Sequence, residues 1–298
     1  MRHGLLAGGG LLAVAAAAIS MLVSHEPAFH GKSTGAWVDE LGAPSSTAAN
    51  ALLEMGPATI PPLILALSRK PSAWIDAYYS TAIPFAPRFL RSRLYDHYLD
   101  WARRQSRIPR LRVEAARVLG DFGTAARMAA PALIESLKDR DPIMRRNAAF
   151  ALGKIGAPAR LATPALAQAL CDRNDEVRMY AAIALKRLGP GAEAAIPALR
   201  AAMKDPNWQV RERAALAVGT VGRNREGVVE ALEAALQDEH RYVRSSAALA
   251  LATLAPTAPS ALATLSHARY DPDAEVRYSA SVAIDKLMSG PAPDADGK

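Results

Sequence analysis

The residues best suited to ionic chemistry in this sequence are arginines and aspartates that recur at a fixed spacing. Arginines stand 33 residues apart from Arg112 to Arg277, and the last five of them each follow an aspartate by six residues. The five pairs are Asp139 and Arg145, Asp172 and Arg178, Asp205 and Arg211, Asp238 and Arg244, and Asp271 and Arg277. Because a partly buried charge needs a partner, the constant step favours a structural ladder in which each arginine bonds an aspartate of its own or the adjacent turn. The alternative is a basic stripe that binds phosphates.

Residues for catalysis or metal binding form no comparable series. The six histidines are His3, His25, His30, His97, His240 and His267. They form no His-x-x-x-His motif and no recurring pair with glutamate, and the run Gly8–Gly10 lies in an apolar segment rather than in a phosphate-binding loop. We therefore predict that the protein is not an enzyme and takes no cofactor or metal.

The 33-residue period indicates a chain built from repeated helix pairs. An alanine follows each arginine by three residues, an aliphatic residue by seven and, in four units, a glycine by eleven. This is the spacing of a helix with an apolar stripe that ends at the glycine. A shorter segment opened by Pro131, Pro164 or Pro197 provides the first helix of a pair. We predict an all-α, right-handed α-solenoid of about seven two-helix repeats, with thirteen or fourteen repeat helices and no sheet.

Two further surfaces of the second helix follow from the same spacing. An apolar residue stands five positions after the arginine in five units, and a helix that is apolar on two sides is expected to be sandwiched inside the stack. These residues are Phe150, Ile183, Leu216, Leu249 and Val282. Positions one, two and nine residues after the arginine are predicted to face solvent on the concave surface, where solenoids usually bind a protein partner. In the central units these candidate partner-binding residues are Arg146, Asn147, Lys154, Met179, Tyr180, Arg187, Glu212 and Arg213.

The repeated units resemble a known family. The segment "PALIESLKDRDPIMRRNAAFALGKIG", which ends at Gly156, resembles a HEAT repeat of the subtype also found in phycobilisome lyases, and the resemblance covers roughly Gly35 to Leu287. The lead-in from Glu26 to Pro44 also resembles the opening of envelope-anchored bacterial HEAT proteins. The resemblance implies a non-catalytic, protein-binding scaffold of the cell envelope, with a bilin lyase-like chaperone or lyase as the alternative. The di-iron hydroxylases of this family are not matched, because they need several His–Glu pairs.

The first 25 residues form a separate part of the chain. Gly4 to Val23 contains twenty residues without a charge, which is long enough to span a bilayer. Arg2 is expected to stay inside, so that residues 26–288, the solenoid, lie outside the cytoplasm on a membrane anchor. The alternative is a cleaved signal peptide and a secreted protein. Residues 289–298 are predicted to be a disordered tail.

The net charge of +7 is concentrated in an insertion at residues 68–109 of the second repeat. Ten basic and three acidic residues lie between Arg69 and Arg112, together with eight of the seventeen aromatic residues, so the rest of the chain is neutral. One possibility is a structural cap with its aromatic residues turned inward. The other is a surface that docks on anionic lipid or an acidic partner. The residues of that docking surface are Trp74, Arg88, Arg91, Arg93, Trp101, Arg103, Arg104 and Arg107. Nucleic acid is an unlikely partner for an exported chain.

Overall fold

The computed structural model describes residues 28–289 apart from positions 44–46, 72, 87, 224, 226 and 255–260. The chain divides into two compact units, Met1–Ala115 and Ala116–Lys298. The described α-helices are α2 to α16, and fourteen of them are repeat helices when α5 of the insertion is set aside. The prediction of an all-α repeat fold is therefore confirmed. The segment 1–25 and all but Ser289 of the predicted tail 289–298 lie outside the described residues.

The first unit holds repeats 1 and 2 and the insertion. Helix α2 contacts α3 and α4, and Trp37, Leu52 and Leu63 are buried between them. The elements of this unit are β1 (Ala28–Phe29), β2 (Lys32–Ser33), α2 (Thr34–Glu40), α3 (Ala48–Glu54), η1 (Pro57–Thr59), α4 (Ile60–Leu67), α5 (Ala73–Phe85) and α6 (Arg88–Asp121), which continues into the second unit.

The prediction of no sheet was wrong, because β1 and β2 form an antiparallel hairpin ahead of the first helix. His30 and Gly31 turn the chain with positive φ values of 49° and 74°. The Trp37 indole N–H donates a hydrogen bond to the Phe29 carbonyl oxygen at 2.9 Å, and the Lys32 ammonium lies 4.4 Å from the Trp37 ring centroid. The lead-in residues therefore tie the hairpin to α2 through a bond between residues eight positions apart, which helical periodicity does not reveal.

The insertion is a helical hairpin whose second helix is continuous with the repeat. Helix α6 runs through Pro109 without a break, so the insertion has no separate end there. Arg112 Nε donates to the Leu67 carbonyl oxygen at 2.8 Å, which joins the ends of the insertion within repeat 2. In the part of the chain that the structure describes, no single helix meets the length and apolarity needed to cross a membrane, and one pair bent by 120°, Ala48–Glu54 with Pro57–Leu67, meets them jointly.

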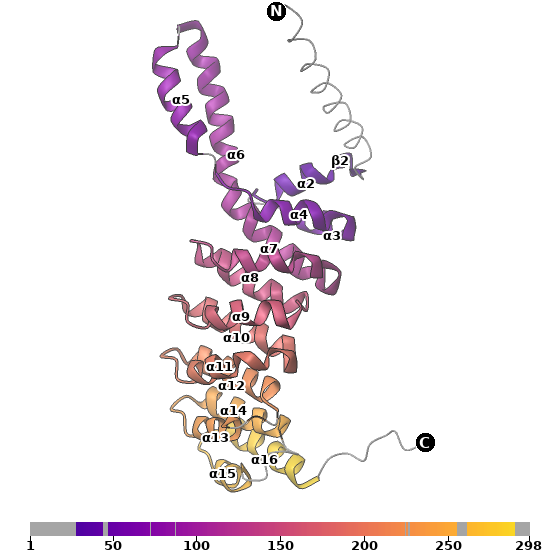
Figure 1. Ribbon diagram of the computed structural model, residues 1–298, viewed down its shortest axis with the longest axis vertical. Helices are drawn as coiled ribbons and strands as arrows, with labels where there is room; N and C mark the ends of the chain where they lie inside the picture. The colour runs from indigo at the N-terminus through magenta and orange to yellow at the C-terminus, as the bar shows by residue number, and fades with distance from the viewer. Residues whose placement is uncertain are drawn as a thin grey trace, which may run out of the picture. The chain divides into compact units, whose positions relative to one another are not determined.

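The second unit stacks five further repeats. Its second helices contact each other in series, from α8 through α10, α12 and α14 to α16, and each packs on the first helix of its own pair (Figure 1). Repeats 3 to 7 are α7 (Ala130–Ser136) with α8 (Pro142–Lys154), α9 (Ala159–Ala169) with α10 (Asp175–Leu188), α11 (Ile196–Ala202) with α12 (Trp208–Val221), α13 (Val228–Ala235) with α14 (Arg241–Thr253), and α15 (Ala261–Ala268) with α16 (Ala274–Ser289). The 3-10 helices η2 (Gly123–Ala129) and η3 (Gly189–Ala195) lead into α7 and α11.

Small residues set the spacing of the second helices. The alanines three residues after the ladder arginines are fully buried, as at Ala148 and Ala181. A Cβ placed on Gly153 would lie 2.9 Å from the Ala184 Cα, so α8 and α10 approach too closely for any side chain at that point. The close seam explains why this chain places so much alanine and glycine on its second helices.

The second helices are sandwiched in the stack as expected, since α10 contacts both α8 and α12, and α12 contacts both α10 and α14. Their apolar column at position five is nevertheless not fully buried. Leu249 is 39 % exposed, and the other members are half-buried: Phe150, Ile183, Leu216 and Val282.

Candidate functional site

The ladder aspartates and arginines join successive repeats. Arg178 Nε and Nη2 donate to the two carboxylate oxygens of Asp205, at 2.7 and 2.8 Å, and Arg178 Nη1 donates to the Asp172 carbonyl oxygen at 2.8 Å. Arg145, Arg211 and Arg244 repeat this pattern toward the aspartate 27 residues later. The acceptor carboxylate thus belongs to the next turn, and the arginine's own turn supplies a backbone carbonyl.

Each ladder carboxylate also organises its turn. Asp205 accepts from the Asn207 amide at 2.9 Å, and Asp271 accepts from the Asp273 amide at 2.8 Å. The bond from Arg244 holds the pKa of Asp271 below its ordinary value against the opposing effect of burial. Arg277, the last of the series, is exposed and donates to the Asp271 and Pro272 carbonyl oxygens. The guanidinium groups of the other four, the inner arginines, bind a carboxylate and a backbone carbonyl of the protein itself, which is the geometry of a structural ladder. The inner arginines are Arg145, Arg178, Arg211 and Arg244.

We use the name second-helix face for positions one, two, five and nine after the ladder arginines on the helices of the second unit, together with the exposed Lys186 at position eight of α10. Its predicted members in repeats 3 to 5 are half-buried or exposed, and several form a cation–aromatic cluster. Phe150 and Tyr180 meet edge to face with centroids 5.5 Å apart. Lys154 and Arg187 lie 5.5 and 5.1 Å from the Phe150 centroid, and Arg146 lies 6.0 Å from the Tyr180 centroid. Asn147 and Met179 are half-buried beside them.

Carboxylates partner part of this cluster. Arg146 pairs with Glu176 at 2.9 Å, and Asp121 accepts from both Arg117 at 2.9 Å and Lys154 at 2.6 Å. Sequence reasoning missed Asp121 and Glu176 as members of this surface, although Asp121 stands nine residues after Arg112 and so shares a column with Lys154.

Burial changes the electrostatics of Glu212, a half-buried member of the second-helix face. Burial raises the pKa of the Glu212 carboxyl, and the nearby Arg213, whose Nε lies 3.5 Å from the carboxylate, opposes that rise. A half-buried carboxylate that stays charged loses part of its hydration, which lowers the local stability of the fold. Such a group is also a candidate for contact with a ligand.

An aromatic cluster interrupts the helix-cap column in repeats 5 and 6. Asn174 and Asn207 cap their helices by accepting from backbone amides, whereas His240 at the same position makes no such cap. Its ring stacks on Trp208 with centroids 3.9 Å apart, and Tyr242 lies 5.5 Å from both rings. Alignment of the repeats places His240 at a helix N-cap. It does not show that the His240 ring stacks on Trp208 instead of capping the helix.

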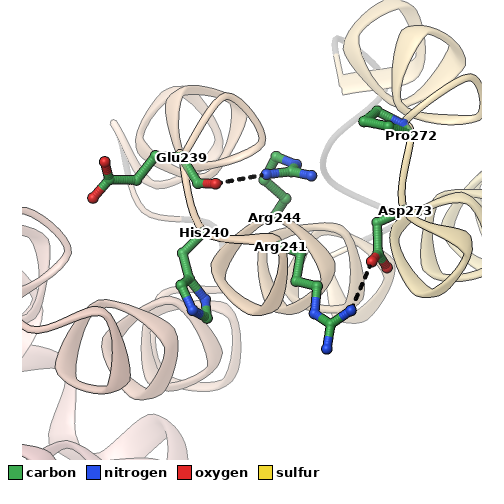
Figure 2. Close-up of a pocket in the computed structure, with 6 residues that line it drawn as sticks. All are labelled: Glu239, His240, Arg241, Arg244, Pro272 and Asp273. Carbon is green, nitrogen blue, oxygen red and sulfur yellow. Dashed lines mark hydrogen bonds and ion pairs between the residues drawn. The ribbon is translucent and has the colours of Figure 1, made fainter.

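A shallow pocket of about 440 Å³ lies next to that cluster, at the turns of repeats 6 and 7 (Figure 2). It is lined by Glu239, His240, Arg241, Arg244, Pro272 and Asp273. Arg241 pairs with Asp273 at 3.2 Å, and Arg244 donates to the Glu239 carbonyl oxygen at 3.1 Å, as the dashed lines show. The two arginines and two carboxylates of the lining balance in charge, so the pocket favours neither an anion nor a cation. Among the described residues no group of three or more His, Cys, Asp or Glu side chains is placed to hold a metal ion.

The insertion presents basic and aromatic side chains on its described surface. Arg93, Arg103, Arg104 and Arg107 are exposed, and Arg103 pairs with Asp100 at 3.1 Å. Helix α6 also carries a row of aromatic rings, with Tyr98 6.4 Å from Tyr95 and 6.0 Å from Trp101, of which Tyr95 is exposed and the other two half-buried.

Three predicted docking residues differ from these exposed arginines, because one bonds the backbone of the insertion and the side chains of the other two are not described. Arg91 donates to the Pro84 and Ala86 carbonyl oxygens at 2.6 and 3.0 Å, so it holds the turn of the hairpin. The side chains of Trp74 and Arg88 lie outside the described residues.

The sequence profile of the HEAT-repeat family matches residues 96–163, 160–219 and 196–285, which together span more than half of the chain. This chain is a HEAT-repeat protein. Its helix pairs are therefore those of HEAT repeats, and the matched segments cover repeats 3 to 6 and repeat 7 up to residue 285. A search of curated proteins finds no match to it.

Solved structures share the fold of this HEAT-repeat protein. An engineered protein is 21% identical over 88% of this chain and 69% of its own, with a TM-score of 0.50. A designed armadillo repeat protein in complex with the peptide (KR)4 is 18% identical over 61% of this chain and 94% of its own, with a TM-score of 0.51. Human deoxyhypusine hydroxylase in complex with glycerol is 25% identical over 73% of this chain and 96% of its own, with a TM-score of only 0.36.

Proposed function

We propose that this HEAT-repeat protein is a non-catalytic scaffold that binds another protein on its second-helix face, the surface expected to be concave. The observation that carries the proposal is the incomplete burial of the apolar column from Phe150 to Val282, in which four side chains are half-buried and Leu249 is exposed. Apolar side chains left partly exposed at the same position of five successive helices mark a candidate interaction site on the surface of a soluble domain. The described residues offer no comparable support for the lyase-like alternative.

Site-specific photo-crosslinking tests the face. A photoreactive amino acid is placed at Ile183, on the face of α10, and in a matched variant at Gln168, an exposed residue of α9 in the same repeat. Crosslinks to a partner from Ile183 but not from Gln168 are expected in the native cell. Equal crosslinking at both positions, or crosslinking from Gln168 alone, would remove the second-helix face as the site.

We also propose that the scaffold works at the cell envelope, attached through its N-terminal segment and assisted by the insertion. The exposed Arg93, Arg104 and Arg107 supply attraction to an anionic surface, at about 1 kcal/mol for each basic group near it. Tyr78, Phe85 and Tyr95, with 60%, 85% and 51% of their surfaces exposed, supply interfacial burial. Residues 25–298 are expected to float with vesicles that contain acidic lipid, and to detach as salt rises because exposed charges are screened. Flotation with neutral vesicles to the same extent would contradict the electrostatic part, and no flotation with either would leave the insertion a structural cap.

A further inference from the structure

The second-helix face carries an excess of positive charge over repeats 3 and 4. Four cationic side chains lie there, and two of them are paired: Arg146 with Glu176 and Lys154 with Asp121. This leaves an excess of two positive charges. The four cations are Arg146, Lys154, Lys186 and Arg187. Lys186 is exposed and close enough to Glu212 to oppose the rise in the pKa of that carboxyl. The face therefore attracts acidic groups at its repeat 3 and 4 end.

The aromatic rings hold these cations in a fixed arrangement. Arg187 is exposed and stacks over Phe150, whose ring is also approached by Lys154. A guanidinium that stacks on a ring keeps its in-plane N–H groups available for a carboxylate, and its order reduces the entropy lost when a ligand binds. The ring that orders the cations is itself a member of the apolar column, so charge recognition and apolar contact occur side by side.

The spacing of the apolar column constrains the shape of what covers it. Each repeat contributes one apolar residue, and helices packed through small residues lie about 8–10 Å apart. A polyproline II segment has three residues per turn and a rise of about 3.1 Å per residue, so every third residue returns to one side after about 9 Å. A β-strand, with a period of two, does not place every third side chain on one side.

We propose that the partner presents an extended, acidic segment of polyproline II type, with an apolar residue at every third position. Its apolar residues lie on Phe150, Ile183, Leu216 and Leu249 in turn, and its carboxylates bind Arg187 and Lys186. This inference rests on the proposed function, because it names the chemistry of the partner for the same face. A polyanion without apolar residues, such as nucleic acid, satisfies the charges but leaves the apolar column uncovered.

The test measures the affinity of the full-length protein, in detergent, for labelled peptides by fluorescence anisotropy. The probe is a peptide of five Glu-Pro-Leu repeats, and its controls replace every glutamate with lysine or every leucine with serine. We expect the probe to bind at least about tenfold more tightly than either control, a difference of about 1.4 kcal/mol. Equal affinity for the lysine peptide or for the serine peptide would overturn the inference.

Two protein variants locate the binding. Arg187→Glu is expected to weaken binding of the Glu-Pro-Leu peptide about tenfold, whereas Arg160→Glu, at an exposed position of α9 in the same repeat, leaves it within about twofold. Matched thermal melts of the two variants show that both are folded. Equal weakening in both variants would mean a non-specific charge effect and would refute the site. If crosslinking at Ile183 captures a partner whose crosslinked segment is basic, this inference fails while the proposed function stands.

Discussion

Removing one inner arginine of the ladder tests whether the ladder holds the stack together. Arg178→Ala deletes three hydrogen bonds and leaves the Asp205 carboxylate, whose side chain is 8% exposed, without its cation. Breaking a buried ion pair by removing one partner costs about 3–5 kcal/mol. Asp205 keeps the bond from the Asn207 amide, and the pair lies near the surface, so we expect a loss of about 2–4 kcal/mol.

Urea unfolding followed by far-ultraviolet circular dichroism measures the loss. In a repeat array the stability is a sum of repeat and interface contributions, so the deletion acts on the interface between repeats 4 and 5 and is expected to broaden or divide the transition. The matched control is Arg277→Ala, in the same column, because Arg277 is exposed and donates to backbone carbonyls. We expect that control to cost less than about 1 kcal/mol.

A double-mutant cycle separates the pair from general damage to the helix. Asp205→Asn keeps an acceptor for the Asn207 amide but removes the negative charge, and its coupling to Arg178→Ala is expected to exceed about 1 kcal/mol. The ladder interpretation would be refuted if Arg178→Ala and Arg277→Ala cost the same within about 0.5 kcal/mol. Loss of partner binding with unchanged unfolding would instead make the arginines ligand contacts.

Three other outcomes follow from the electrostatics and from the seam. The hydrogen bond from Arg244 lowers the pKa of Asp271. Burial acts to raise the pKa of Asp172, but the hydrogen bonds from Arg145 and from the Asn174 amide, together with nearby positive charge, outweigh it, so that pKa is also lowered. Both carboxylates therefore stabilise the fold when the pH is above their unfolded pKa of about 4. That stability is expected to be lost as the pH falls through their folded pKa values, which an acid series of urea melts measures; an unchanged midpoint down to about pH 3 would contradict it. Because burial raises the pKa of Glu212, its charged form destabilises the fold at neutral pH, so Glu212→Gln is expected to raise the unfolding midpoint at pH 7 and to have no effect below about pH 4. A Cβ on Gly219 would lie 2.6 Å from the Cβ of the facing alanine, so Gly219→Ala is expected to cost about 1–3 kcal/mol, and Gly120→Ala, with a nearest approach of 3.3 Å, less; equal melting temperatures for the two variants would refute the close seam.

Much of the fold follows from the sequence because each repeat meets the same neighbours. Residues at equivalent positions of successive repeats, such as the ladder arginines or the buried alanines, have the same surroundings. Their burial and their pairing partner can therefore be inferred from any one repeat. The left-handed glycines that follow the second helices at Gly123, Gly156 and Gly189 agree with this, with φ values of 56°, 59° and 67°. Gly222, in the same column, departs from the pattern with a φ of −94°.

Several features that sequence reasoning missed have partners outside the period. The hairpin of β1 and β2 depends on the single indole of Trp37, and the bonds of Arg91 depend on the turn of an insertion that occurs once. The position-five column was visible in the sequence. An apolar residue on a helix can pack on a neighbouring helix or remain exposed for another molecule, and its hydrophobicity does not distinguish the two cases.

The contrast between the two apolar columns bears on function. Position three holds a fully buried alanine from Ala115 to Ala280, whereas position five in repeats 3 to 7 holds phenylalanine, isoleucine, leucine and valine of different shapes. Variation in size does not by itself mark a binding surface, because the buried column just before the ladder arginines also varies, as at Leu111, Met144 and Val177. Position five differs from that column because its apolar side chains are not fully buried. Under the function proposed above, the different side chains at position five contact different groups of the partner, whereas the ladder, which is the same from repeat to repeat, holds the stack together.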